Sequence, residues 1–142
     1  MSHELSADDR RFMADLEAGA IESGQFDHRA HVRAAYIYLA GHDVEGAAAG
    51  MRDTLRAFLQ HHGLPVSKYH ETITRAWILA VRHFMDRTPP TPSADAFIDA
   101  NPRLLDPKIM LTHYSAALLF SPEARARFME PDIDPIPPPV PD

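Results

Sequence analysis

The chain has 142 residues, no cysteine, nine histidines and a formal net charge of −6 with the histidines neutral. A chain of this length fits one domain with a sizeable core, and the absence of cysteine excludes disulfides, thiolate metal sites and thiol catalysis. The acidic balance, with Lys and Arg scattered, argues against nucleic-acid binding, and no segment approaches the about 20 apolar residues of a membrane helix. We therefore expect a soluble, cytoplasmic protein that binds neither nucleic acid nor membrane.

Capping residues and stop signals divide the first part of the chain into four helices. Each begins after a Ser or Asp whose side-chain oxygen can accept a hydrogen bond from a backbone N–H of the first turn. Each then carries apolar residues at helical spacing and ends near Gly or before Pro. The expected helices are residues 7–23 after Ser6, 28–40 after Asp27, 44–62 after Asp43, and 68–87 after Ser67.

The second part of the chain predicts shorter helices and a proline-rich tail. A cap followed by proline occurs at Asp106-Pro107 and at Ser121-Pro122, and it predicts helices over 108–120 and 122–129. Another short helix is expected between Ser93 and Asn101. No segment alternates with strand period, so the fold class is all-α: a single-domain bundle of about four main helices with short connecting helices. The domain is expected to span 1–130, and the tail 131–142.

Four histidines are predicted to point toward a shared interior. His28 and His31 are three residues apart near the start of the second helix, so their side chains share one face. His70 falls in the predicted first turn of the fourth helix, in line with the apolar stripe that contains Trp77. His113 lies in the middle of the predicted helix 108–120, also on an apolar face. Because burying several titratable rings without a purpose is costly, a shared site is expected.

Two further residues are candidates for catalysis. Glu71, next to His70, is a candidate general base or metal ligand, although an ion pair with Arg75 one turn later is the favoured single interpretation. Tyr114, next to His113, is a candidate hydrogen-bond donor, with packing as the alternative. The remaining histidines are expected to have structural or surface roles: His3, His42, His61, His62 and His83.

Several sequence blocks resemble a family of small bacterial helical proteins to which no activity is assigned. The blocks are FDHRAHVR at 26–33, YHETITR at 69–75, LTHYS at 111–115 and LLFSPEAR at 118–125. A more distant likeness is to DinB-type four-helix bundles, which hold a metal with three histidines. Those bundles place two histidines four residues apart on one helix, a spacing that is absent here. This second likeness implies a metal held by a bundle and not membership of that family.

The leading hypothesis is a small metalloenzyme that acts on a small metabolite. His28, His70 and His113 would bind a divalent metal (Zn, Ni or Fe), with His31 as a fourth ligand or as a neighbour that orients them. The second hypothesis is a metal-free enzyme in which these histidines, Glu71 and Tyr114 act as acid and base on a small molecule. The third is a non-enzymatic binding module. The oligomeric state is left open, with a homodimer as one option.

Overall fold

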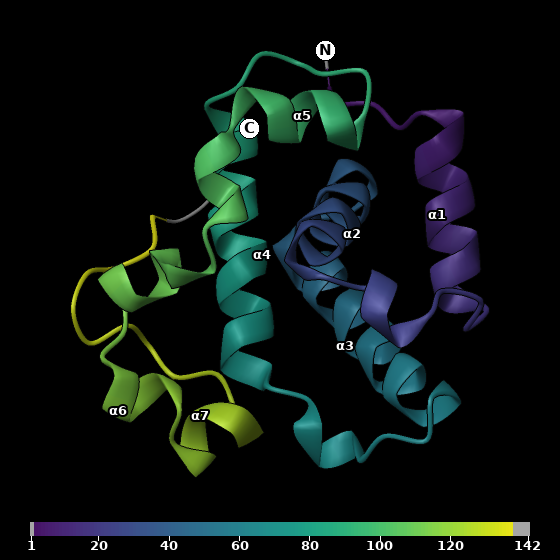
Figure 1. Ribbon diagram of the computed structural model, residues 1–142. Helices are drawn as coiled ribbons and strands as arrows, with labels where there is room; N and C mark the ends of the chain where they lie inside the picture. Colours follow the sequence, from purple (N-terminus) through teal and green to yellow (C-terminus); the bar gives the residue numbers. More distant parts are fainter. Residues whose placement is uncertain (1, 138–142) are drawn as a thin grey trace.

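The computed structural model describes residues 2–137, and in this part of the chain it contains helices and no strands, which confirms the all-α fold. The sequence order places the longer helices first and the shorter ones last (Figure 1). The longer helices are α1 (Ala7–Glu17), α2 (His28–Gly41), α3 (Val44–His61), α4 (Glu71–Asp86) and α5 (Ala94–Ala100). The short elements are η1 (Ser23–Gln25), η2 (Val66–Lys68), η3 (Pro102–Leu105), η4 (Pro107–Thr112), α6 (Ala116–Leu119) and α7 (Pro122–Ala126).

Most of the predicted caps are confirmed, and one is not. The side chains of Ser6, Asp27 and Asp43 accept hydrogen bonds from the backbone N–H three residues later. The fourth helix, however, begins at Glu71 and not after Ser67, because residues 66–68 form the separate 3₁₀ turn η2. Its N-cap is His70, whose ring nitrogen takes the place of the usual hydroxyl or carboxylate oxygen.

Helix α2 is the centre of the bundle and packs against α1, α3, α4 and α5 (Figure 1). Its small, buried Ala34 and Ala35 allow the neighbouring helices to approach closely, and its fully buried Tyr36 stacks on Phe97 of α5 with ring centroids 5.0 Å apart. The hydroxyl of Tyr36 donates to the backbone carbonyl of Glu4 at 2.7 Å, so the N-terminal segment is held against this core.

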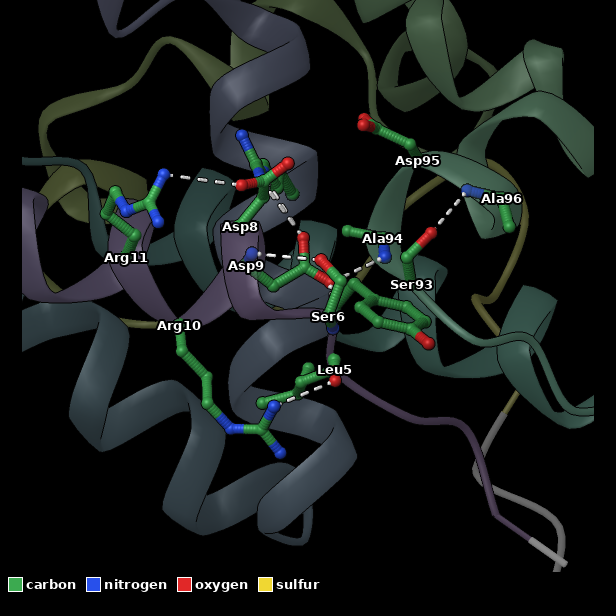
Figure 2. A network of polar contacts seen from close by, with 12 residues as sticks. Leu5, Ser6, Asp8, Asp9, Arg10, Arg11, Ser93, Ala94, Asp95 and Ala96 are labelled. Carbon is green, nitrogen blue, oxygen red and sulfur yellow. Dashed lines mark hydrogen bonds and ion pairs between the residues drawn. The ribbon is translucent and has the colours of Figure 1, made fainter.

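A buried carboxylate joins α1 to α2 and α5. Asp9 is only 1% exposed, and its Oδ2 accepts hydrogen bonds from the backbone N–H of Ser6 at 3.0 Å and of Ala94 at 2.9 Å (Figure 2). Its Oδ1 pairs with the guanidinium of Arg33, on α2, at 3.2 Å. Although burial raises the pKa of Asp9, the hydrogen bonds from Ala94, Ser6 and Arg33 outweigh it, so the pKa is lowered and the group stays charged.

The predicted helix 108–120 is wrong in one respect, because the chain is interrupted in its middle. Residues 107–112 form η4, and a new helix, α6, starts after Ser115, whose hydroxyl caps it. The carboxylate of Asp132 accepts hydrogen bonds from both the N–H and the hydroxyl of Ser115 at 2.7 Å. This contact with Asp132, which is distant in the sequence, stabilises the interruption between η4 and α6. A small core of Met110, Tyr114 and Leu119 packs this region on α4.

The described part of the predicted tail lies on the body of the protein. Besides the contact of Asp132, the backbone N–H of Ile133 donates to the carbonyl of His113 at 2.9 Å. The prolines at 138, 139 and 141, which belong to the predicted proline-rich tail, lie outside the described residues. None of the helices in the described region has the length and apolar character needed to cross a bilayer.

Candidate functional site

A half-open cavity of about 640 Å³ lies between α2, α3, α4 and the segment η4–α6. Each of these elements turns an apolar stripe toward it, so most of its wall is hydrocarbon and aromatic ring. Its volume and its few polar groups are typical of sites that bind small organic molecules. The apolar wall includes Phe26, Val32, Met51, Phe58, Ile73 and Trp77.

Three of the four predicted site histidines line this cavity. His28 and His31 come from the first turn of α2, where the Asp27 cap fixes the start of the helix and therefore the direction of both side chains. His70 comes from the start of α4. The structure therefore brings these three histidines, which come from two helices, to one cavity.

His31 is the histidine most open to a ligand. Its half-buried ring stacks on Phe26 with centroids 4.0 Å apart and planes 19° from parallel. No hydrogen bond joins this ring to another residue within 2–137, and every fully buried polar side-chain atom in that range has a partner. The ring nitrogens of His31 therefore reach the open space of the cavity. Burial, with the nearby His28, lowers the pKa of His31 from 6.5 to about 4, so the ring is neutral at physiological pH.

His28 is held in one orientation by the backbone. Its Nε2–H donates to the carbonyl of Leu104 at 2.9 Å, which fixes the tautomer and leaves Nδ1 with a lone pair. Its ring meets Trp77 edge-on, with centroids 4.6 Å apart and planes at 66°. A histidine held in this way can accept a hydrogen bond from a ligand without first rearranging.

His70 has a structural role at both of its nitrogens. Nδ1 accepts the backbone N–H of Ile73 at 3.0 Å as the cap of α4, and Nε2–H donates to the carbonyl of Leu119 at 2.8 Å. Burial lowers its pKa, which keeps the ring in the neutral form that both contacts require. His70 thus joins α4 to α6 at the wall of the cavity, and it has no nitrogen lone pair left for a metal or a ligand.

His113 is not part of the cavity, which corrects the expectation that it faces the same interior. The short helix η4 ends before this residue, which is its C-cap, and the Nδ1 of His113 lies 2.7 Å from the carbonyl oxygen of Asp134 in the C-terminal segment. The expected helical phase fails because η4 is a 3₁₀ helix that turns faster than an α-helix.

Glu71 pairs with α3 and not with Arg75, so the expected ion pair within α4 is wrong. Its carboxylate receives two hydrogen bonds from the guanidinium of Arg52, at 2.7 and 3.0 Å, and one from the hydroxyl of Tyr69 at 2.6 Å. The Arg52 hydrogen bonds lower the pKa of Glu71, whereas burial and Glu71 raise the pKa of Tyr69 to about 12. Arg75 instead pairs with Glu45, also on α3. These contacts fasten α4 to α3 beside the cavity, and Glu71 is not among the residues that line it.

Tyr114 also lies outside the lining of the cavity. It is fully buried in the small core, and its hydroxyl donates to the carbonyl of Met129 at 2.7 Å. Burial and the charge of Glu130 raise its pKa to about 12. This geometry gives Tyr114 the packing role that was the alternative interpretation of the sequence.

The four predicted metal ligands do not form one coordination set. Among residues 2–137, no three side chains of His, Asp or Glu are grouped so that they could hold a metal ion. The cavity offers instead two imidazoles, His28 and His31, in an apolar surrounding. Such a set can orient one polar group of a ligand through hydrogen bonds. Three of the histidines expected to be structural, His3, His42 and His62, do bond to backbone carbonyls.

Two residues of the site were missed by sequence reasoning. Lys68 and Lys108 line the cavity from η2 and η4, and both are exposed. They are the only lysines of the chain, whose other basic residues are arginines. This contrast was visible in the sequence, but nothing in the local pattern indicated that the two residues meet at one cavity.

Comparison of the chain with protein-family models, with curated proteins and with solved structures found no match. The resemblance to a family of small bacterial helical proteins therefore stays a prediction, and we infer the function from the site itself.

Proposed function

We propose that the protein binds a small, mainly apolar organic molecule in the cavity, and that His28 and His31 bond to its polar group. The observation that carries this proposal is the cavity itself: about 640 Å³ of apolar space with a few polar groups converging on it. A bundle of this size would gain stability by filling that space with its own side chains, so maintaining it favours a role in binding.

The pKa of His31 supports binding over proton abstraction by this residue. A general base works best when its pKa is near the working pH, and a pKa of about 4 makes His31 a weak base at neutral pH. A neutral imidazole nevertheless accepts and donates hydrogen bonds well. The hypothesis of a metal-free enzyme has less support, because two of its expected catalytic groups bond to other parts of the protein. Glu71 binds Arg52, and Tyr114 donates to the carbonyl of Met129.

The metal-dependent enzyme has less support than ligand binding. A three-histidine site would need a lone pair from His70, whose nitrogens both bond to the backbone, and from His113, which lies at another face. Binding of a metal would have to break the cap of α4. A small-molecule ligand requires no such change.

The test is titration with Nile red, a neutral apolar dye whose fluorescence rises in apolar surroundings. We expect the wild-type protein to bind one dye per chain. Leu55→Trp should weaken this binding, because Leu55 lines the cavity and the larger ring occupies part of it. Leu5→Trp is the matched control, since Leu5 packs on the main core outside the cavity lining.

Circular dichroism should confirm that both variants are folded as the wild type is. Failure of the wild type to bind the dye, or equal binding by the two folded variants, would refute the proposed function.

A further inference from the structure

We infer that the ligand is an organic anion, an apolar molecule that carries one carboxylate besides the polar group at His28 and His31, and that Lys68 and Lys108 hold this carboxylate. This inference rests on the proposed function and names the class of ligand for the same cavity. It begins from the placement of the only two lysines of the chain, which both line this cavity although they are 40 positions apart and belong to different elements.

Neither lysine has an ion-pair partner among the described residues. Within residues 2–137 no carboxylate forms an ion pair with Lys68 or Lys108, whereas seven ion pairs link arginines to acidic residues. A lysine can lay its hydrocarbon stem along an apolar wall and keep its ammonium group at the edge, as these two positions require. The two ammonium groups are thus available for an anion.

The charge of the cavity opposes that of the whole chain. The protein carries −6, but among the described residues the lining contains two lysines and only one acidic residue, Asp27. The carboxylate of Asp27 is already bonded to the backbone N–H of Ala30 at 3.0 Å, as the cap of α2. An anion that approaches this otherwise acidic protein is therefore attracted to the cavity and repelled from most other surfaces.

The rest of the cavity specifies an apolar body for this anion. Leu111 and Phe120 line it and are 41% and 63% exposed, which is unusual for side chains of this kind. They extend the apolar wall outward on the side of η4 and α6. Together with the lysines they make an amphipathic entrance, which matches a molecule that has a hydrocarbon part and one charged end.

A carboxylate fits this arrangement better than a phosphate ester. Many phosphate sites use glycine-rich backbone N–H cradles, and no glycine of the described residues lines this cavity. Lysine acts as a point charge, and two of them at an apolar cavity suit a compact monoanion.

The test compares decanoate with decanol, which share a hydrocarbon chain and differ in charge. Because Trp77 is the only tryptophan and lines the cavity, its fluorescence reports binding directly. At low ionic strength the wild-type protein should bind decanoate about tenfold more tightly than decanol. Lys68→Met and Lys108→Met, which keep the apolar stem, should each weaken decanoate binding about threefold and leave decanol binding unchanged. Lys→Arg at either position should retain the preference.

A second measurement uses the unmodified wild-type protein. Acetylation by an N-hydroxysuccinimide ester, followed by peptide mass spectrometry, should show that decanoate protects Lys68 and Lys108 but not the terminal amine. Equal affinity for decanoate and decanol, without protection of the lysines, would overturn the inference while leaving the proposed function intact. Failure of both compounds and of Nile red to bind would refute the proposed function as well.

Discussion

The stability of the protein in mild acid should depend on His31, and replacing this residue with Phe should remove that dependence. Burial and the nearby His28 lower its pKa from 6.5 to about 4. As the pH falls through 6.5 the unfolded chain takes up a proton, whereas the folded protein takes it up only near pH 4. The contribution of the neutral ring is therefore complete above pH 6.5 and is lost between these two values.

The expected loss is large enough to measure. The interval between 6.5 and about 4 corresponds to about 3 kcal/mol in full, because one pH unit is worth about 1.4 kcal/mol. At about pH 5 the unfolded chain is almost fully protonated at this site and the folded protein is not, so about 2 kcal/mol should be lost. A domain of this size is stable by only about 5–15 kcal/mol.

Urea unfolding near pH 7.5 and near pH 5 measures this loss in the wild type and in His31→Phe. The Phe ring can keep the stacking on Phe26 but cannot take up a proton. We expect the variant to lose about 2 kcal/mol less than the wild type between the two pH values. His42→Phe, at an exposed position, is the matched control and should lose as much as the wild type. An equal loss in all three proteins would show that His31 is not the half-buried, neutral group described above.

The other predictions concern stability, the site boundary and metal. Asp9→Asn should lower the free energy of unfolding by about 3 kcal/mol, because it leaves a largely buried guanidinium without its charge partner; a loss below about 1 kcal/mol in urea titration would contradict this. Glu71→Gln should cost about 2 kcal/mol through weaker bonds to Arg52, yet dye binding should persist, since Glu71 does not line the cavity. His113→Ala should leave the dissociation constant for Nile red unchanged, and a clear rise would place His113 in the site after all. Treatment with a chelator should alter neither the melting temperature nor dye binding; a fall that added zinc reverses would instead favour the metalloenzyme.

The helix starts and ends that depend on interactions between neighbouring residues could be predicted from the sequence. Asp27 and Asp43 cap the helices that follow them, because each carboxylate needs only a backbone N–H three residues away. Gly63 ends α3 with a φ of +66°, a conformation that glycine adopts without strain. The shared face of His28 and His31 followed from helical periodicity in the same way. These interactions span one or two turns, so they can be recognised without knowing the fold.

The tertiary structure decided every feature that depends on a distant partner. Helix 108–120 is broken where Asp132 binds Ser115, and no nearby residue signals that contact. Glu71 and Arg75 suit each other at one turn's distance, but α3 offers each a partner, Arg52 and Glu45, and those pairs form instead.

In the site, too, some features could be predicted from the local sequence and others depended on the tertiary structure. Periodicity predicted that histidines face inward, and His28, His31 and His70 do line one cavity. The backbone of other segments decided which ring nitrogens stay available to a ligand. The carbonyl of Leu119, for example, accepts the Nε2–H of His70. The placement of Lys68 and Lys108 at the same cavity depends on how η2 and η4 pack around α4, and side-chain patterns along one element carry no information about that packing.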